Sequence, residues 1–358
     1  MRALLAAALI LAASCATPAF NESEWRSARD ACAPESLHAP HEENGRFFNP
    51  WLRMEDKGVM DMVRWKLSRA PRFGEEEKNF HPRLATGALE RLRGDPMEDA
   101  VVWLGHSSFL MRLGGEYWLT DPVLSNDRFM LKREMPAALQ AADLATLGAR
   151  ISVIISHNHY DHLDRETLAA LPEGTRAFVP LGLAGTVREA GIKDVREMDW
   201  WQEIDFGNGA MIACLPAQHW SRTLSQDTNT TLWAGFLVRA GGRSLYFCGD
   251  GGMFIGFREI GRRYPGIDYA LLPVNPTFPR WLMHYQHMDT DEALDAFRDL
   301  GARIMIPMHW GTFRLGDEPA GYAGLQLARR VRERSIDPAR VLILGAGEVH
   351  LPGGRGER

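Results

Sequence analysis

The chain has 358 residues, 45% of them apolar and 24% charged, and its formal net charge at pH 7 is −5. This length and this apolar content are sufficient for one large domain with a sizeable core. The acidic balance, without any run of basic residues, argues against a nucleic-acid-binding protein, and we expect no nucleic-acid partner.

The first fifteen residues have the form of a bacterial export signal. Arg2 precedes an apolar run over 3–11, which is too short to cross a bilayer as a mature helix and is typical of a secretory signal peptide. The Leu-Ala-Ala-Ser-Cys stretch over 11–15 resembles a lipobox, so we expect Cys15 to be the lipidated first residue of an outer-membrane lipoprotein that faces the periplasm. The alternative is cleavage after Ala16 by ordinary signal peptidase, which would release a soluble protein.

The rest of the sequence divides into an N-terminal extension and one domain. Residues 16–50 lack hydrophobic periodicity and predict a linker, whereas 51–350 are expected to form a single domain. Within 54–69, four apolar side chains share one face at helical spacing: Val59, Met60, Val63 and Leu67. This predicts a helix that either docks on the core through that face or serves as a lid or membrane-facing helix.

Four short apolar runs each end at a histidine or an aspartate. The runs cover 151–156, 211–215, 245–248 and 303–308, and they lead to His157, His219, Asp250 and His309. Such runs, bounded by Gly or Pro, predict buried strands. Because ligands collect at the carboxyl ends of strands in layered α/β folds, we expect the four segments to converge on one rim.

The densest cluster is the His-x-His-x-Asp-His motif that follows the first run. It contributes His157, His159, Asp161 and His162 within six residues. Imidazole and carboxylate are ligands that suit zinc. A structural zinc site is closed and usually rich in cysteine, and no cysteine here has ligand spacing, so a purely structural metal is disfavoured. The remaining alternative is a polar loop whose histidines are ordinary surface residues.

The number of donors is sufficient for two metals. We expect His157, His159 and His219 to bind one ion, and Asp161, His162 and His309 to bind the other. Asp250 is a single carboxylate between the two groups, and it is therefore the expected bridge. Two ions held about 3.5–4 Å apart can lower the pKa of a shared water and stabilise both oxygens of a displacement.

These residues carry a family resemblance. The metal motif with His219, Asp250 and His309 resembles the metallo-β-lactamase fold. Segments 103–106, 119–122, 280–289 and 308–313 are similar to N-acyl-phosphatidylethanolamine-hydrolysing phospholipase D and its bacterial relatives. The resemblance implies an α/β protein with a four-layer αβ/βα sandwich. It also implies two zinc ions with the ligand sets given above, and Tyr160 and His287 in contact with the phospholipid head.

Two further residues are candidates for supporting the ligands. His106 follows a predicted strand and could donate to a ligand from behind, and Asp121 could brace a ligand histidine through its second nitrogen. For Asp121 the alternative is a turn residue that caps a strand end.

The expected function is that of a di-zinc phosphodiesterase of the phospholipase D type. It would cleave N-acyl-phosphatidylethanolamine to N-acylethanolamine and phosphatidic acid through a hydroxide that bridges the metals, with Asp250 and Asp161 as catalytic carboxylates and a membrane surface as partner. One alternative is a lactonase or small-molecule phosphodiesterase on the same two metals. Another is a non-catalytic cell-envelope lipoprotein with a structural metal.

Overall fold

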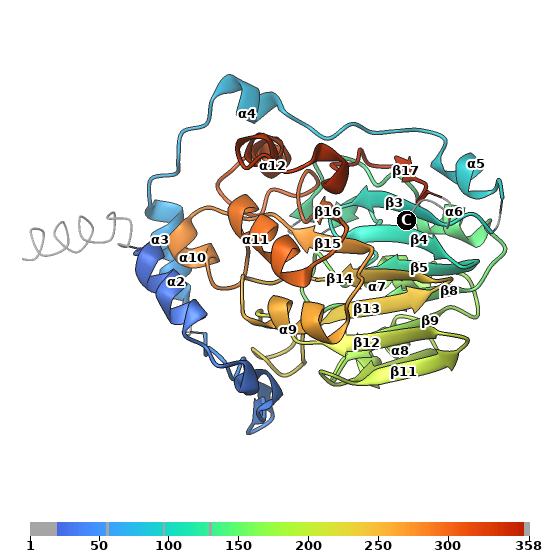
Figure 1. Ribbon diagram of the computed structural model, residues 1–358, viewed down its shortest axis with the longest axis horizontal. Helices are drawn as coiled ribbons and strands as arrows, with labels where there is room; N and C mark the ends of the chain where they lie inside the picture. Colours follow the sequence, from blue (N-terminus) through green and yellow to red (C-terminus); the bar gives the residue numbers. More distant parts are fainter. Residues whose placement is uncertain (1–19, 55–56, 96, 129–130, 354–358) are drawn as a thin grey trace, which may run out of the picture.

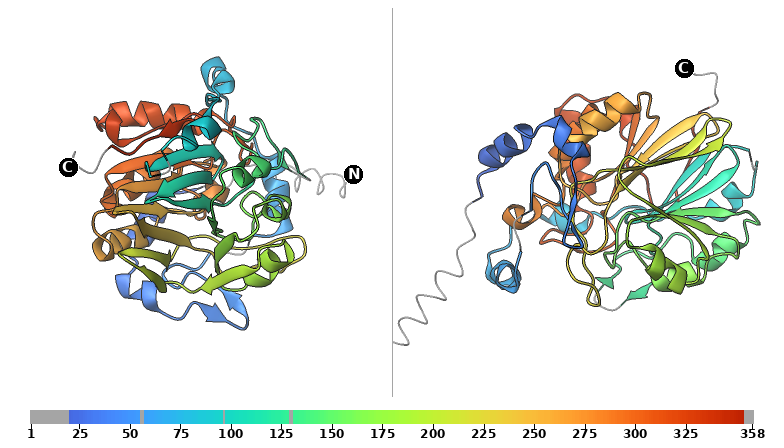
Figure 2. Two further views of the ribbon diagram at one scale, coloured as in Figure 1. Left: turned by 90° about the vertical axis from the view of Figure 1, so that its right-hand side faces the viewer. Right: turned by 90° about the horizontal axis from the view of Figure 1, so that it is seen from below.

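The computed structural model describes residues 20–54, 57–95, 97–128 and 131–353. Two β-sheets pack face to face, and helices cover their outer faces, which gives the expected four-layer α/β sandwich (Figures 1 and 2). The leader and Cys15 lie outside the described residues. Within the described residues, none of the helices has the length and apolar character needed to cross a membrane.

The first sheet has seven strands in the order β10-β9-β8-β5-β4-β3-β17. Its strands are β3 (Ala100–Gly105), β4 (Ser108–Leu113), β5 (Glu116–Thr120), β8 (Ile151–Ile154), β9 (Arg176–Pro180), β10 (Asp194–Met198) and β17 (Val349–His350). Alternate residues of β3 face opposite layers: Val101 and Trp103 join the core between the sheets, and Val102 and Leu104 join the core under the helices. Both faces of this sheet are therefore buried.

The second sheet has six strands in the order β11-β12-β13-β14-β15-β16. Its strands are β11 (Glu203–Gly207), β12 (Ala210–Leu215), β13 (Gly235–Ala240), β14 (Arg243–Phe247), β15 (Tyr269–Pro273) and β16 (Ile304–Met308). The four strands predicted from the apolar runs are thus confirmed as β8, β12, β14 and β16. Two small hairpins complete the strands, β1 (Glu42–Glu43) with β2 (Arg46–Phe47), and β6 (Asp127–Arg128) with β7 (Leu131–Lys132).

The helices lie outside the sheets. They are α2 (Glu22–Asp30), α3 (Val59–Leu67), α4 (Glu75–Asn79), α5 (Ala88–Leu92), α6 (Ala141–Ala145), α7 (Arg165–Ala169), α8 (Ala184–Glu189), α9 (Gly256–Arg263), α10 (Arg280–Met283), α11 (Thr290–Leu300) and α12 (Tyr322–Glu333), with short 3-10 helices at η1 (Pro34–His38) and η2 (Pro338–Arg340). Side chains of α5 to α8 pack in the core under the first sheet, and those of α9, α11 and α12 join the core of the second.

The strand directions bring four loops together. β12 is antiparallel to β13 and β13 to β14, while β14, β15 and β16 run parallel. The carboxyl ends of β12, β14 and β16 therefore meet at one edge of the second sheet. The loop after β8 reaches the same edge, because the Ala234 N–H donates to the Ser156 carbonyl at 2.9 Å.

The N-terminal extension is more ordered than a linker. Asn21 caps α2 by accepting from the N–H groups of Ser23 and Glu24, and Trp25 and Arg29, one helical turn apart, are both buried. Arg29 lies 3.4 Å from the buried carboxylate of Glu292 on α11. The prediction of a linker is wrong for this segment, because its few apolar and charged side chains find partners on the domain surface that no local periodicity reveals.

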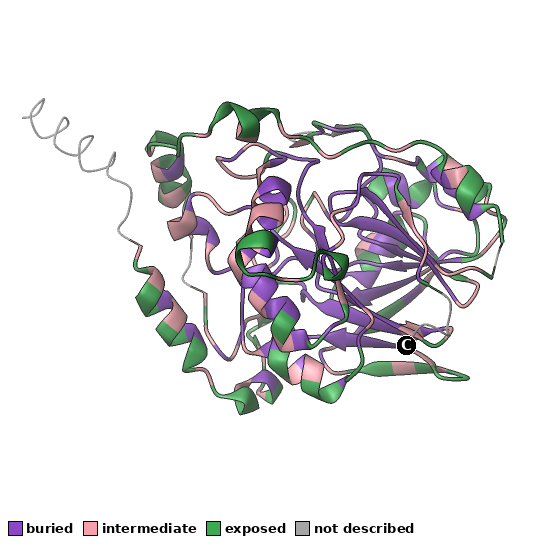
Figure 3. Cartoon of the chain, turned by 45° about the horizontal axis from the view of Figure 1, so that its top comes forward, coloured by how far each residue is buried: buried purple, intermediate pink, exposed green. Residues whose placement is uncertain are grey.

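Helix α3 is confirmed, but it does not dock through its apolar face. Val59 is 79% exposed, Met60 73%, Val63 42% and Leu67 50%. The buried side chain is Trp65, which packs against Leu282 and Met283. In Figure 3 the strands are mostly buried, whereas the outer helices mix buried, intermediate and exposed residues. The expectation that α3 docks on the core by its apolar face is therefore wrong, because one tryptophan on another face makes the contact.

Candidate metal centre

The motif after β8 folds back on itself as a turn. The N–H groups of His162 and Leu163 both donate to the His159 carbonyl, at 3.0 and 2.9 Å. This turn presents His157 and His159 from one arm and Asp161 and His162 from the other. His157 and His162 are 1% and 0% exposed, so the motif is a buried site and not a polar surface loop.

Gly249 allows the second sheet to approach this turn closely. Its φ is +62°, and a Cβ at this position would lie 2.4 Å from the Cβ of Ser156. Only glycine fits both conditions without strain. Asp250, the next residue, is thereby placed within reach of the histidines from the first sheet.

One group of donors gathers His157, His159, His219 and Asp250, with ligand atoms that all lie within 4.8 Å of one another. His157 Nε2 lies 2.8 Å from His159 Nδ1, which in turn lies 3.2 Å from His219 Nε2. The structure therefore brings together the donors that the sequence predicts for the first metal.

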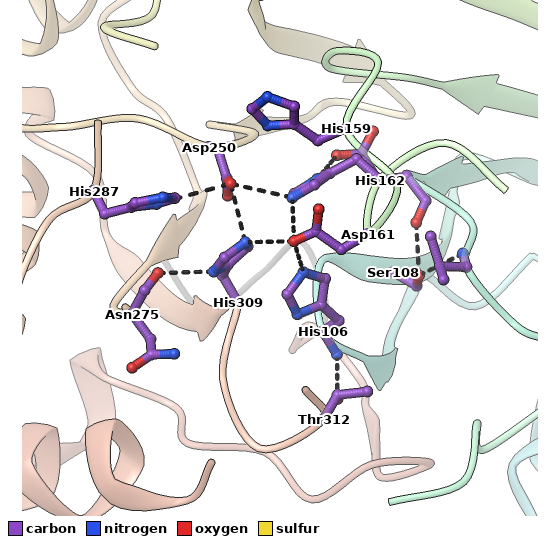
Figure 4. A network of polar contacts seen from close by, with 12 residues as sticks. His106, Ser108, His159, Asp161, His162, Asp250, Asn275, His287, His309 and Thr312 are labelled. Carbon is purple, nitrogen blue, oxygen red and sulfur yellow. Dashed lines mark hydrogen bonds and ion pairs between the residues drawn. The ribbon is translucent and has the colours of Figure 1, made fainter. Parts of the chain in front are cut away.

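A second group gathers around Asp161. Its Oδ2 lies 3.5 Å from His162 Nε2, 3.3 Å from His309 Nε2 and 3.1 Å from His106 Nε2 (Figure 4). The first two contacts agree with the predicted donor set. His106 was expected behind the ligands, but its ring is among the donors that lie within 4.8 Å of one another. We therefore regard His106 as a candidate ligand of the second ion, in addition to Asp161, His162, His309 and the shared Asp250.

Asp250 lies between the two groups. Its Oδ2 is 3.0 Å from His309 Nε2 and 3.2 Å from His162 Nε2 on one side, and 3.8 Å from His219 Nε2 on the other. Figure 4 shows the carboxylate with contacts to several rings. This is the arrangement required of a carboxylate that bridges two cations.

Buried atoms of the centre that make no hydrogen bond of good geometry within the described residues include His162 Nε2, His309 Nε2 and Asp250 Oδ1. Leaving such atoms unsatisfied costs about 1–3 kcal/mol each, so native structures rarely bury them without a partner. Divalent cations would satisfy lone pairs of these imidazoles and carboxylates. The residues present therefore fit a pair of metal ions.

Three of the histidines are held in place by contacts to the ring nitrogen that points away from the centre. The Nδ1 of His162 lies 2.6 Å from Asp121 Oδ2, which also accepts from the Ser156 hydroxyl at 2.6 Å. His309 Nδ1 lies 2.7 Å from the Asn275 carbonyl, and His219 Nδ1 lies 3.0 Å from the Gln286 carbonyl. Such contacts orient metal-binding rings and select their tautomer.

The brace by Asp121 agrees with the sequence-based expectation. The two carbonyl contacts and the role of Ser156 were missed. Backbone carbonyls carry no sequence signal, because every residue has one, and Asn275 and Gln286 become neighbours of the histidines only through the fold.

Two residues of the centre hold uncommon backbone conformations. His106 has φ +53° and His309 has φ +63°, values that side chains with a Cβ rarely adopt. The two loops are tied together, since the His309 N–H donates to the His106 carbonyl at 3.2 Å and the His106 N–H donates to Thr312 Oγ1 at 2.7 Å. Strain of this kind persists where the surroundings fix it, and it is commonly found at functional sites.

Charges in the centre are strongly coupled. Burial raises the pKa of Asp250, but the charges of His162 and His309 outweigh burial and hold this pKa well below its usual range. Burial lowers the pKa of His309, but Asp250 and Asp161 outweigh it and raise the pKa to about 9. Metal binding needs neutral imidazoles, so it would displace protons from these rings.

The two residues expected to contact substrate differ in their surroundings. His287 is partly exposed beside the centre, with Nδ1 3.8 Å from Asp250 Oδ2, and its contact with substrate stays a prediction. Tyr160 is 39% exposed. Its hydroxyl accepts from the Leu224 N–H at 2.7 Å, so Tyr160 also holds the loop that follows His219.

A cavity of about 380 Å³ lies beside the centre. Its wall includes His219 and Trp233, together with residues 43–44, 46–49, 53–54 and 228–229. Asn49 closes one side, where its Nδ2 donates to the His219 carbonyl at 2.9 Å. The N-terminal extension thus forms part of the wall next to a metal-ligand candidate.

The fold and the site agree with a known family. The sequence profile of the beta-lactamase superfamily domain matches residues 117–310, just over half of the chain. The chain therefore belongs to the beta-lactamase superfamily. The expected metallo-β-lactamase fold is confirmed.

Within this superfamily, the chain is similar in sequence to several individual proteins. The chain is 35% identical over 233 residues to N-acyl-phosphatidylethanolamine-hydrolyzing phospholipase D 1 of Caenorhabditis elegans, covering 60% of this chain and 65% of the relative. It is 39% identical over 242 residues to an uncharacterized protein of Mycobacterium tuberculosis, covering 64% and 63%. It is 28% identical over 253 residues to a UPF0173 metal-dependent hydrolase of Pyrobaculum aerophilum, covering 70% and 98%. The expected resemblance to the phospholipase is confirmed, and the match spans less than two thirds of the first two relatives.

Solved structures share the fold at low identity. Igni18, a metallo hydrolase from Ignicoccus hospitalis, aligns with a TM-score of 0.53 at 22% identity, covering 72% of this chain and 99% of that protein. The isothiocyanate hydrolase from Delia radicum gut bacteria aligns with a TM-score of 0.57 at 20% identity, covering 70% and 98%. CmlA, a diiron beta-hydroxylase from Streptomyces venezuelae, aligns with a TM-score of 0.52 at 21% identity, covering 72% and 55%. At these identities the likeness concerns the fold alone.

Proposed function

We propose that this protein is a metal-dependent hydrolase that cleaves phosphodiesters in the manner of a phospholipase D, with N-acylated ethanolamine phospholipids as the substrate class. The observation that carries the proposal is the pair of ligand groups joined by Asp250, each with ligand atoms that lie within 4.8 Å of one another. The similarity to the Caenorhabditis elegans phospholipase supports the choice of substrate.

Two zinc ions would be held by the residues of the two groups. One ion would be held by His157, His159 and His219, and the other by Asp161, His162 and His309. Asp250 would bind both ions, and His106 is an additional candidate ligand of the second ion. When bound, such ions supply Lewis-acid stabilisation of a phosphoryl group and lower the pKa of a water at the site.

The protein's own groups orient this chemistry. Asp121 and the Asn275 and Gln286 carbonyls fix three imidazoles, so that their inner nitrogens stay aimed at the centre. Rigid placement of this kind avoids reorganisation when charge develops on the phosphoryl oxygens. His287 lies at the partly exposed side of Asp250, where it can donate to a polar headgroup.

The test is a product analysis on purified protein that carries zinc. N-acyl-phosphatidylethanolamine in detergent micelles should yield N-acylethanolamine and phosphatidic acid, and His159→Ala should yield neither. Turnover of a water-soluble lactone or small phosphodiester with no cleavage of the lipid would contradict the assigned substrate class. Absence of metal-dependent turnover on every ester would contradict a hydrolase.

The location in the cell envelope is part of the proposal. Removal of the leader before Cys15 and lipidation of Cys15 would anchor the protein to the outer membrane, where its phospholipid substrates lie. After a high-salt wash, Cys15→Ser should then be found in the soluble fraction, whereas the wild type should stay in the membrane fraction. If the Cys15→Ser variant still incorporates a labelled fatty acid and stays in the membrane fraction, Cys15 is not the anchoring site.

A further inference from the structure

Helix α3 (Val59–Leu67) carries most of the strongly exposed apolar side chains of the described structure. Of the nine large apolar residues that stand exposed, five lie on this helix of nine residues: Val59, Met60, Met62, Val63 and Leu67. With 3.6 residues per turn, Val59, Val63 and Leu67 form one line along the helix. An exposed apolar face of this kind is typical of an interaction surface.

The orientation of α3 is fixed by contacts on its other side. Trp65 packs against Leu282 and Met283 of α10, and its Nε1 donates to Asp317 Oδ1 at 2.8 Å. Lys57, just before the helix, donates from its ammonium group to the Leu282 carbonyl. The apolar line is therefore held outward and is not an incompletely packed core face.

Basic residues flank the apolar line. Arg64 and Lys66 lie on the helix itself, and Arg69 and Arg72 follow within five residues of its end. None of these four cations makes an ion pair with a carboxylate of the described residues. Two cations on the helix and two more shortly after its end, together with an apolar face, are the combination expected of a helix that lies in an interface with anionic lipid.

The surroundings of α3 link it to the metal centre and to the start of the chain. Helix α10, on which α3 packs, precedes His287 by only a few residues. On the same short segment, the ring of His284 contacts Phe20, the first described residue, with 4.3 Å between ring centroids. Figure 1 shows α2, α3 and α10 side by side at one end of the molecule, where the chain begins. An anchor at the N-terminus would hold this end near a membrane.

We propose that α3 docks on a bilayer that contains anionic phospholipid, with Val59, Val63 and Leu67 inserted among the headgroups and the flanking cations on the lipid phosphates. This inference deepens the proposed function and rests on it for its biological sense, because a phospholipid must be reached in its bilayer. A second copy of the chain is a poorer occupant. A nine-residue helix is about 14 Å long, and its face offers far less than the roughly 800 Å² per partner of a stable protein interface.

The experiment measures binding, independently of turnover. The chain from Ala16 onward, which lacks the expected leader and lipid, is sedimented with vesicles of equal phosphatidylglycerol and phosphatidylcholine, and with phosphatidylcholine alone. The wild type should bind the anionic vesicles, and less so in high salt. The Val59→Ser/Val63→Ser/Leu67→Ser variant should bind at least tenfold more weakly. The matched control is Leu84→Ser, an apolar residue that is 48% exposed outside α3, and it should bind as the wild type does.

A second measurement does not use the triple variant, so a folding defect in that variant does not affect its result. Val63→Cys in a Cys32→Ser background, labelled with an environment-sensitive fluorophore, should shift its emission on addition of the anionic vesicles, whereas Leu84→Cys should not. Equal vesicle binding by the wild type and the triple variant, or none by either, would overturn the proposal. A wild-type dimer that the triple substitution dissociates would also overturn it in favour of a second copy. Vesicle binding through α3 without lipid cleavage would refute the proposed phospholipase activity and leave the docking surface intact.

Discussion

The Nδ1 of His162 and the Oδ2 of Asp121 lie 2.6 Å apart in a pair whose side chains are both fully buried. Asp121 is not a ligand candidate in either metal group, but it orients a ring that is. Asp121→Asn keeps the shape and removes the charge that stabilises the Nδ1–H of His162. We therefore expect metal affinity to fall by about 10–100-fold, measured by competition with a chromogenic chelator.

The matched control for this substitution is Asp164→Asn. Asp164 is also a buried carboxylate after β8, but it caps α7 and accepts from Ser125 and Thr167. Its replacement should lower the free energy of unfolding by about 1 kcal/mol and leave metal affinity unchanged. Equal metal affinity in Asp121→Asn and the wild type would mean that Asp121 merely closes the turn after β5.

Asp250 should be harder to replace than any single outer ligand. Asp250→Asn removes a negative charge that lies within 3.2 Å of both His162 and His309. Turnover should drop by roughly three orders of magnitude and its pH optimum should move upward, because the water at the site loses metal activation. His309→Ala should be milder and partly rescued by excess zinc. The turnover of both variants is measured against pH and zinc concentration. Near-native turnover of Asp250→Asn together with no turnover of His309→Ala would exclude Asp250 as the bridge.

Arg280 should stabilise the fold through its buried pair with Glu292 on α11. This guanidinium lies 2.7 Å from Glu292 and 3.2 Å from Glu22 on α2. Arg280→Met leaves the buried Glu292 without its nearest counter-ion, so the free energy of unfolding should fall by about 3 kcal/mol. Urea unfolding measures the change, and Arg280→Met/Glu292→Met should recover most of it.

The control for the Arg280 substitution is Arg330→Met, which breaks partly exposed pairs on α12. Its effect should stay within about 0.5 kcal/mol. If Arg280→Met costs no more than this control, the buried pair of Arg280 and Glu292 does not stabilise the fold.

Glu318 should make stability depend on pH. Its carboxylate accepts from the Thr277 N–H at 2.5 Å and from the Phe278 N–H at 3.2 Å, next to the loop that orients His309. Burial raises the pKa of Glu318 from 4.5 to about 7, despite these hydrogen bonds. Because the folded pKa lies above the unfolded one, the contribution of Glu318 to stability is complete below about pH 4.5 and is lost as the pH rises to about 7.

Glu318→Gln removes this titration. Between about pH 4.5 and 7, the stability of the wild type should decline relative to Glu318→Gln by up to about 3 kcal/mol. Urea unfolding of both proteins across this range measures the difference, with the exposed Glu333→Gln as a control for general pH effects. A difference between wild type and Glu318→Gln that does not vary with pH would show that Glu318 titrates as an exposed carboxyl does.

The sequence predicts the centre well because its signals are local. The motif after β8 and the apolar runs that end at His219, Asp250 and His309 identify both the strands and the converging donors. Asp121 could be anticipated from its place at a strand end.

The remaining features depend on contacts between distant segments. The Asn275 carbonyl behind His309 and the approach of His106 to Asp161 arise only when both sheets are in place. The order of 22–50 depends on partners such as Glu292, more than 250 residues away along the chain. The outward face of α3 likewise depends on Trp65 finding its contact on α10, which the helical spacing alone does not predict.

The most direct test of the two-metal centre is a count of metal ions in the purified protein, by elemental analysis after removal of loosely bound metal. Two occupied ligand groups predict about two ions per chain, near one in His159→Ala or His309→Ala, and full loss of turnover in the His159 variant. One ion or none in the wild type, with turnover retained, would contradict a two-metal centre.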